Sequence, residues 1–268
     1  MADLVRGRRC LVMGASNHRS LGWAIARALH AEGAELFFSY ASERSGEHLS
    51  DLLAALPNGD RMPRVQCDVE RDEQIAALIR RVGEHWDGQL DVVVHTAGHS
   101  RAEELSGSYM NISREGYAFA HSISAYSLVA VAREGAPLLG GGEAARLGGG
   151  ASVMTLTYAA AERVVPDYNV MASAKAALET HVRYLAAELG PRNVRVNAIS
   201  AGPIRTLSAS AVKSLAASRR AMEERAPLRR NVSAEDVAGV ALFLASDLAR
   251  SVTGAIVNAD NGWHVLSA

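Results

Sequence analysis

Residues 10–33, CLVMGASNHRSLGWAIARALHAEG, begin with a short apolar run and continue into a stretch whose apolar residues recur at helical spacing. The turn from Gly14 to Gly22 joins the two parts. This order predicts a strand, a turn and a helix, which is the unit from which parallel sheets are built.

The same order recurs along the chain. Short apolar runs alternate with helical patterns, the runs at 10–14, 35–40, 64–69, 90–98, 151–157, 194–200 and 255–260 and the helices at 20–33, 42–56, 71–86, 113–138, 168–190 and 233–247. The runs lack a clean polar and apolar alternation, as expected when helices cover both faces of a parallel sheet. Ser113 and Ser233 precede helical patterns, and Asp236 follows Ser233 at capping-box spacing. We predict an α/β fold, a Rossmann-like doubly wound sheet of about seven parallel strands with helices on both faces.

Composition narrows the function classes. Of 268 residues, 49% are hydrophobic and 21% are charged, which is typical of a globular enzyme and not of a disordered chain. A net charge of −1 offers no bulk attraction to nucleic acid or anionic membranes. The N-terminal apolar stretch is too short for a secretory signal, and no apolar run is long enough to span a membrane. We expect a cytoplasmic protein with one domain over 1–268, with Cys10 and Cys67 as buried, reduced thiols.

The first candidate site lies after the first strand. A glycine at the carboxyl end of a strand, here Gly14, lets backbone approach a pyrophosphate, and the next helix offers unpaired N–H groups. The spacing from Gly14 to Gly22 is too long for G-x-G-x-x-G, so an ordinary strand-to-helix turn is an equal reading. Asp68, after the third strand, either accepts from an adenine amino group or caps the next helix.

The fourth strand ends in His95, Thr96, Ala97 and Gly98, small residues that would let backbone pass a nicotinamide ribose. His95 and His99 are four residues apart, but they straddle a strand end instead of sharing a helix face. We therefore expect no metal site.

The strongest signal is TYAAAERVVPDYNVMASAKAAL, which contains Tyr158, Tyr168 and Lys175. Tyr168 and Lys175 are seven residues apart, so on one helix they share a face two turns apart. A lysine ammonium near a tyrosine lowers the pKa of the phenol and can bind ribose hydroxyls, leaving the phenol to donate to a developing oxyanion. The alternative is two partly buried tyrosines and a lysine that extends to the surface.

These residues resemble the short-chain dehydrogenase/reductase superfamily. Most members place the lysine four residues after the tyrosine, where this chain has Ala172. The Tyr-x6-Lys spacing, with an upstream tyrosine, is similar to the divergent branch typified by bacterial type II enoyl-acyl-carrier-protein reductase. The similarity also covers SLGWAIARAL, SREGYAFAHSISAYS, VRVNAISAGPIRTL and SDLARSVTG.

The resemblance implies reduction of a trans-2-enoyl thioester on acyl carrier protein, in fatty acid biosynthesis. Tyr168 would donate to the enolate oxygen, Lys175 would orient the cofactor ribose, and Tyr158 would be the second active-site tyrosine. The residues carried over as cofactor contacts are Gly14, Ser20, Leu21, Asp68, Val69, Ala97, Gly98, Lys175, Ile204 and Thr206. Those carried over toward the substrate are His99, Ser100, Tyr158 and Ser208. A loop and helix at about 204–225 would cover the substrate.

The resemblance leaves several points open. Ala41 and Ser42 stand where NADPH-preferring relatives carry basic residues, which favours NADH, although Arg44 could contact a 2′-phosphate. His99 stands where an apolar aromatic is usual, and Ser208 replaces a small apolar residue.

Partners are also implied. Lys213, Arg219, Arg220 and Arg225 offer a basic surface to the acidic carrier, or form an ordinary solvated helix face. A homotetramer is expected from the family, although burial within one chain would explain Trp263 equally well. The alternatives are a specialised reductase acting on a different enoyl or carbonyl substrate in a secondary pathway, and a nucleotide-binding protein without chemistry.

Overall fold

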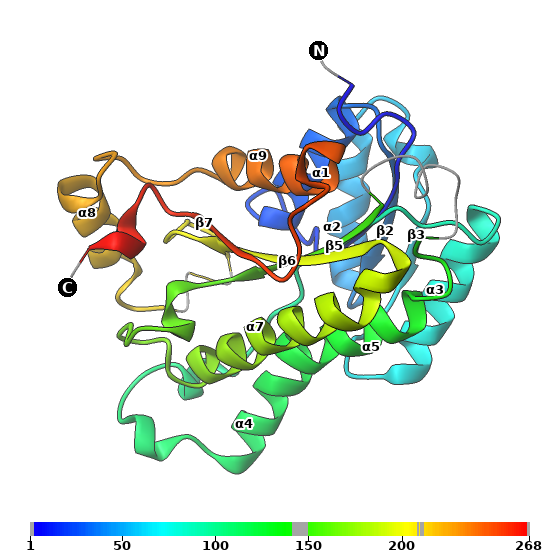
Figure 1. Ribbon diagram of the computed structural model, residues 1–268. Helices are drawn as coiled ribbons and strands as arrows, with labels where there is room; N and C mark the ends of the chain where they lie inside the picture. The colour runs from blue at the N-terminus through cyan, green and yellow to red at the C-terminus, as the bar shows by residue number, and fades with distance from the viewer. Residues whose placement is uncertain (1–2, 141–149, 208, 210–211, 267–268) are drawn as a thin grey trace.

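A computed structural model describes residues 3–140, 150–207, 209 and 212–266. In these residues seven parallel strands form one sheet in the order β3-β2-β1-β4-β5-β6-β7 (Figure 1). The strands are β1 Arg9–Met13, β2 Glu35–Tyr40, β3 Arg64–Gln66, β4 Val92–His95, β5 Ala151–Thr157, β6 Val194–Ala201 and β7 Ile256–Ala259. The predicted doubly wound sheet is confirmed.

The helices follow the predicted alternation. They are α1 Leu21–Ala31, α2 Glu43–Ala54, α3 Asp72–His85, α4 Arg114–His121, α5 Ser127–Gly135, α7 Asn169–Leu189, α8 Leu215–Arg225 and α9 Ala234–Ala245. None of the described helices is long and apolar enough to cross a membrane. Most of the glycine-rich stretch at 140–150 lies outside the described residues.

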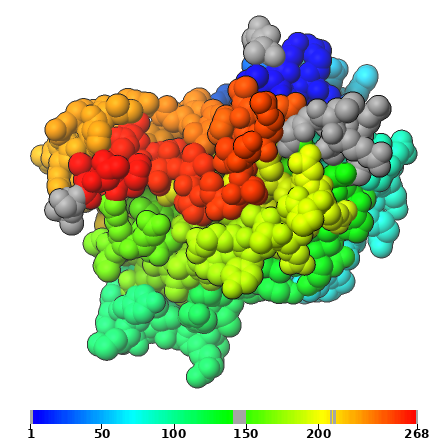
Figure 2. Space-filling view, viewed as in Figure 1, coloured from blue at the N-terminus to red at the C-terminus, as the bar shows by residue number. Residues whose placement is uncertain are grey.

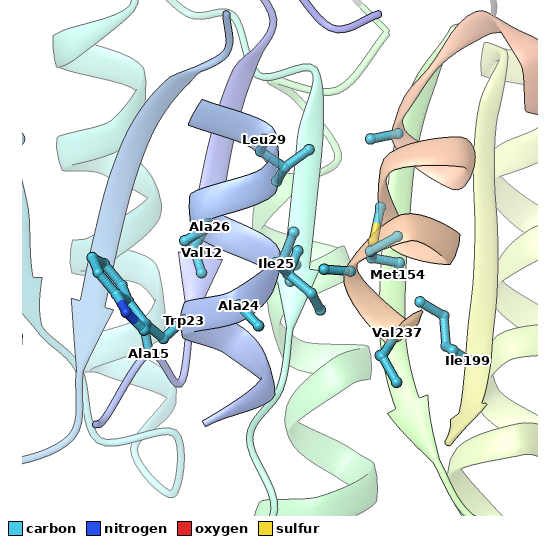
Figure 3. Packing of buried hydrophobic residues seen from close by; sticks show 14 of the residues in the cluster. Val12, Ala15, Trp23, Ala24, Ile25, Ala26, Leu29, Met154, Ile199 and Val237 are labelled. Atoms are coloured by element: carbon cyan, nitrogen blue, oxygen red, sulfur yellow. The ribbon is translucent and has the colours of Figure 1, made fainter. Parts of the chain in front are cut away.

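Successive residues of each strand face opposite sides, so the sheet supports two cores. Cys10 and Val12 of β1 belong to the cluster covered by α1, α2 and α9. Leu11 and Met13 belong to the cluster covered by α3, α5 and α7. Figure 3 shows the first cluster, where side chains of α1 such as Ile25 lie with residues of the central strands and α9. Burial on both faces explains the missing alternation in the sequence.

The predicted helix at 113–138 is interrupted. A π-helical segment, η4 Ser122–Tyr126, separates α4 from α5. Within it the carbonyl of Ile123 accepts a hydrogen bond from the hydroxyl of Ser127 at 2.6 Å. A side-chain donor of this kind competes with the backbone ladder, which is one way in which a helix widens locally. Such π-segments are frequent at functional sites.

The capping box predicted for α9 is confirmed. The Asp236 carboxylate accepts from the backbone N–H of Ser233 at 2.8 Å, and the Ser233 hydroxyl accepts from the N–H of Asp236 at 3.0 Å. Arg230 donates to both Asp236 oxygens, at 2.7 and 3.2 Å. The hydrogen bond from Arg230, with those from Ser233, lowers the pKa of Asp236 from 3.8 to about 2.

We predict that Asp236→Asn lowers the free energy of unfolding by about 1 kcal/mol at neutral pH, the usual cost of a lost cap. Because the folded-state pKa is depressed, the contribution is complete above the unfolded-state value of 3.8 and disappears as pH falls through about 2. Urea unfolding at a series of pH values should show a constant difference from wild type above about pH 5 and a shrinking one below. Glu73→Gln removes an exposed charge from the first turn of α3 without touching this cap, and an equal loss there would contradict the assignment.

Candidate active site

The turn after β1 is fixed by a close approach to β4. Gly14 has φ +94°, and a Cβ there would lie 2.4 Å from Oγ1 of Thr96. A Cβ at Gly22 would lie 2.7 Å from the same oxygen. The Thr96 hydroxyl donates to the carbonyl of Met13 at 2.6 Å. Both glycines are therefore needed to bring the start of α1 onto the carboxyl end of β1, where the strand order reverses.

Ser20 and Leu21 begin α1. The Ser20 hydroxyl caps the helix, accepting from the N–H of Trp23 at 3.3 Å, and donates to the carbonyl of Asn17 at 2.7 Å. The Leu21 side chain packs against the core beneath α1. A contact from Leu21 to a ligand at this turn would therefore use its backbone.

Asp68 and Val69 follow β3. The Asp68 carboxylate accepts from the N–H of Glu70 at 3.1 Å and lies 3.7 Å from Nε of Arg71. Arg71 is itself the N-cap of α3 and makes no side-chain cap, so the alternative of Asp68 as helix cap is wrong. Val69 packs against the second core cluster.

The loop after β4 lies against the π-segment. A Cβ at Gly98 would lie 3.6 Å from Nζ of Lys175 and 3.9 Å from Oγ of Ser124. The Ser124 hydroxyl accepts from the N–H of His99 at 3.0 Å and lies 3.2 Å from the His99 carbonyl. Ala97 and Ser100, on either side, are partly buried. Residue spacing gave no sign of Ser124, because the π-segment that presents it arises in the folded chain.

His99 itself is exposed, with its ring 5.7 Å from that of Phe119. His95 is fully buried, its Nε2 lying 2.8 Å from Oγ of Ser127 and its Nδ1 3.1 Å from Oγ1 of Thr155. Burial, reinforced by the charge of Lys175, lowers the pKa of His95 to about 3, so the imidazole is neutral. The two histidines thus have separate partners, and the described residues include no cluster of three potential metal ligands.

Tyr158 and Tyr168 meet beside β5, and Lys175 contacts the same end of the strand. Tyr158 directly follows the strand, and its ring centre lies 4.9 Å from that of Tyr168 at an angle of 57°. Tyr168 is the N-cap of α7 and does not lie within the helix, because its φ is −126°. Tyr168 and Lys175 were expected on one regular helix, but the helix begins one residue after Tyr168. Lys175 is buried on α7 and donates to the carbonyl of Leu156 at 2.8 Å.

Burial controls the ionisation of these groups. Burial, with the neighbouring Tyr158, raises the pKa of Tyr168, and burial also raises the pKa of Tyr158. The lowering of the phenol pKa expected from a nearby lysine is thus wrong in direction. Burial lowers the pKa of Lys175 to about 8, against the opposing effect of Glu179. The tyrosines are therefore protonated at neutral pH and able to donate.

Ile204 and Thr206 lie in the loop after β6. The N–H of Thr206 donates to the carbonyl of Ile204 at 2.9 Å, and the Thr206 hydroxyl accepts from the N–H of Ala209 at 3.0 Å. Ser208 lies outside the described residues. The loop is linked to α8, since Arg219 donates to the carbonyl of Pro203 at 3.0 Å.

The basic residues of the predicted covering segment differ in exposure and in their partners. Lys213 is exposed, whereas Arg219 turns inward, Arg220 pairs with Glu224 at 2.7 Å, and Arg225 lies 5.9 Å over the ring of Trp263. Trp263 is thus packed within the chain. Figure 2 shows α8 in orange beside the C-terminal residues in red at one end of the molecule.

Comparison with known proteins gives a consistent result. The family described as "Enoyl-(Acyl carrier protein) reductase" matches residues 14–264. The NADH-dependent enoyl-[acyl-carrier-protein] reductase FabI of Bacillus cereus is 44% identical over 264 residues, covering 98% of this chain and 99% of that protein. The corresponding Escherichia coli protein is 41% identical over 260 residues, covering 97% and 95%.

Solved structures agree with the sequences. The crystal structure of the Bacillus cereus enoyl-acyl carrier protein reductase with NADP+ and indole naphthyridinone superposes with a TM-score of 0.92 at 44% identity, covering 99% of each chain. The Aquifex aeolicus enzyme superposes with a TM-score of 0.90 at 39% identity, covering 99% of this chain and all of that one.

We predict that Tyr168 does not ionise near pH 10, where a tyrosine in water does, because burial raises its pKa. The phenolate absorbance of wild type minus that of Tyr168→Phe should show no step near about pH 10 in the folded protein. The same difference in denaturant should show the step of one ordinary tyrosine. Equal steps in both conditions would contradict the burial of this phenol.

Proposed function

Because the chain belongs to the enoyl-(acyl carrier protein) reductase family, we propose that Tyr168, Lys175 and Tyr158 carry out the reaction of that family. The protein is an NADH-dependent oxidoreductase that reduces the carbon-carbon double bond of an enoyl thioester in fatty acid biosynthesis. The observation that supports the residue assignment is the contact of the two tyrosine rings beside a buried lysine at the carboxyl end of β5.

The residues present fit a dinucleotide. Gly14 and Gly22 leave no side chain between the turn and the N-terminus of α1, where backbone N–H groups and the helix dipole suit a pyrophosphate. Nζ of Lys175 lies beside Gly98 in the loop after β4, a position that suits ribose hydroxyls. Asp68 with Val69, and Ile204 with Thr206, are proposed for the adenine and nicotinamide ends. Bound NADH would supply the hydride for the β-carbon of the substrate.

Side chains of the protein stabilise the charge that develops during the reaction. As the β-carbon gains a hydride, negative charge develops on the thioester oxygen, and the protonated Tyr168 donates a hydrogen bond to it. The Lys175 ammonium adds positive charge and orients the ribose. Tyr158, whose ring packs on that of Tyr168, restricts the donor to one orientation. His99 and Ser100 are proposed to face the acyl chain.

The chain is proposed to form one reductase domain with α8 as its covering element. Met222 is the buried residue of α8, and the rest of the helix is partly or fully exposed, so it is attached by a small contact. Its closure over the proposed substrate site would exclude water from the enolate. The Tyr-x6-Lys spacing supports placement in the divergent branch of the superfamily, with the bacterial type II enzymes. The chain is also proposed to form a homotetramer, in which the exposed tyrosines of η4 and α7, Tyr126 and Tyr184, would be available for contacts between copies.

We predict that Tyr168→Phe lowers kcat by about 10²- to 10³-fold, the usual cost of one oxyanion donor, while the Kd for NADH stays unchanged. The assay follows oxidation of NADH, and separately of NADPH, with a trans-2-enoyl thioester. Tyr158→Phe should lower kcat by a smaller factor than Tyr168→Phe. If neither cofactor is oxidised by wild type although NADH binds, the exposed His99 would direct the search to other unsaturated or carbonyl substrates.

We also predict that the exposed Lys213 contributes to carrier docking, because acyl carrier protein is acidic. Lys213→Glu should raise KM for the carrier-bound substrate several-fold at low salt and leave KM for a coenzyme A thioester nearly unchanged. Arg80→Glu, an exposed position on α3 far along the sheet, is the matched control. Equal effects of both reversals would contradict a docking role for Lys213.

A further inference from the structure

The end of β5 holds two consecutive contacts to α7. The carbonyl of Leu156 accepts from the Lys175 ammonium at 2.8 Å, and the hydroxyl of the next residue, Thr157, donates to the Glu179 carboxylate at 2.7 Å. Lys175 and Glu179 are one turn apart on α7, at the i,i+4 spacing that places side chains on one face. Tyr158 follows immediately, so this strand end fixes the lysine, the glutamate and one tyrosine together.

Glu179 is a buried carboxylate that the reaction does not use. It is 5% exposed, and Thr157 is 4% exposed. On its other side it lines a cavity of about 60 Å³ together with polar residues, among them Ser200, Asn258 and His264. A polar cavity of this size has room for water, which would solvate a carboxylate that is otherwise enclosed. Lys175 does not line this cavity.

We propose that Glu179 is a positioning residue that acts as the buried counter-charge of Lys175, keeping its ammonium charged and directed at the cofactor site. An isolated buried ammonium tends to lose its proton, and one carbonyl acceptor satisfies only one of its three donors. The carboxylate acts through space along the helix, while Leu156 holds the amine in place. The Thr157 hydroxyl favours the charged form of the carboxylate.

Several charged and titratable groups surround the pair, and among them Arg163 and His264 line the cavity beside Glu179. His95 on β4 faces Lys175 and is neutral, as shown above. Burial raises the pKa of Glu179, and the hydrogen bond from Thr157 opposes this rise. Glu162, before α7, also raises this pKa, whereas Arg183, one turn further along α7, and Lys175 lower it. Burial lowers the pKa of Lys175 to about 8 even though the negative charge of Glu179 opposes this, so the charge of Glu179 keeps the pKa from falling further. Removing it should therefore take the ammonium through its titration within the working pH range.

The chain contains only two lysines, Lys175 and Lys213, which makes the test direct. Competitive acetylation over a pH series, read peptide by peptide by mass spectrometry, reports the fraction of free amine at each lysine, with the exposed Lys213 as internal reference. Glu179→Gln should lower the labelling midpoint of Lys175 by about one pH unit or more, the usual effect of a nearby opposite charge. Glu179→Asp keeps the negative charge, so the labelling midpoint of Lys175 in this variant should lie close to that of wild type.

A matched control comes from the same region. Glu162 is exposed, so Glu162→Gln removes one negative charge nearby and should leave the Lys175 midpoint in place. Thr157→Val keeps the volume of the side chain and removes its donor; it should move the midpoint in the same direction as Glu179→Gln, by less. Circular dichroism and thermal unfolding show whether Glu179→Gln folds. If it does not, the labelling midpoints of Lys175 in Thr157→Val and Glu179→Asp test the proposal instead.

The inference rests on the role proposed for Lys175, and the readouts separate the two. Labelling is measured without substrate, so a shifted midpoint supports the counter-charge even if enoyl reduction is not observed. With activity present, the alkaline limb of the kcat/KM profile should move to lower pH in Glu179→Gln, and NADH affinity should fall at alkaline pH. An unchanged midpoint in a folded Glu179→Gln variant, or an equal shift in Glu162→Gln, would overturn the proposal.

Discussion

Parallel pairing of β1 with both β2 and β4 fixes the geometry on which the candidate site depends. The strand order reverses between β1 and β4, so the carboxyl ends of these two strands lie next to each other with no connection crossing between them. Gly14, Gly22 and Thr96 meet there within distances that leave no room for a Cβ. The helix N-terminus and the loop after β4 are thereby held at the same edge of the sheet, where a dinucleotide fits.

The opposite side of the site depends on β5 and α7. Three successive residues at the strand end present a backbone carbonyl, a hydroxyl and a phenol. Lys175 of α7 donates to the carbonyl, and Glu179 of α7 accepts from the hydroxyl. Burial has opposite consequences for the two kinds of group: it keeps Tyr168 neutral and pushes Lys175 toward losing its charge. A protonated phenol and a charged amine at one strand end fit the proposed role of stabilising a developing enolate oxygen. The surrounding polar groups therefore matter as much as the three residues themselves.

The π-segment between α4 and α5 connects these two sides. Ser127 joins the buried His95 to the carbonyl of Ile123, and Ser124 contacts both backbone polar groups of His99. The loop that is proposed to face the acyl chain is thus held by a local widening of a helix, which is in turn held by a neutral histidine on β4. These contacts hold the loop after β4 against the π-segment.

Residue patterns along the chain were enough to predict the alternation of strands and helices, the burial of both sheet faces, the capping box of α9 and the candidate residues Tyr158, Tyr168 and Lys175. Periodicity and turn chemistry are local properties, and they can be read before the chain is folded. The resemblance to a family supplied the reaction. The folded chain was needed to show that Tyr168 lies just before its helix, that the pKa of its phenol is raised instead of lowered, and that Arg219 turns inward. It also placed Ser124, His95 and Glu179 at the site. These depend on burial and on contacts between residues distant in sequence, and a pattern of residue types carries no record of either.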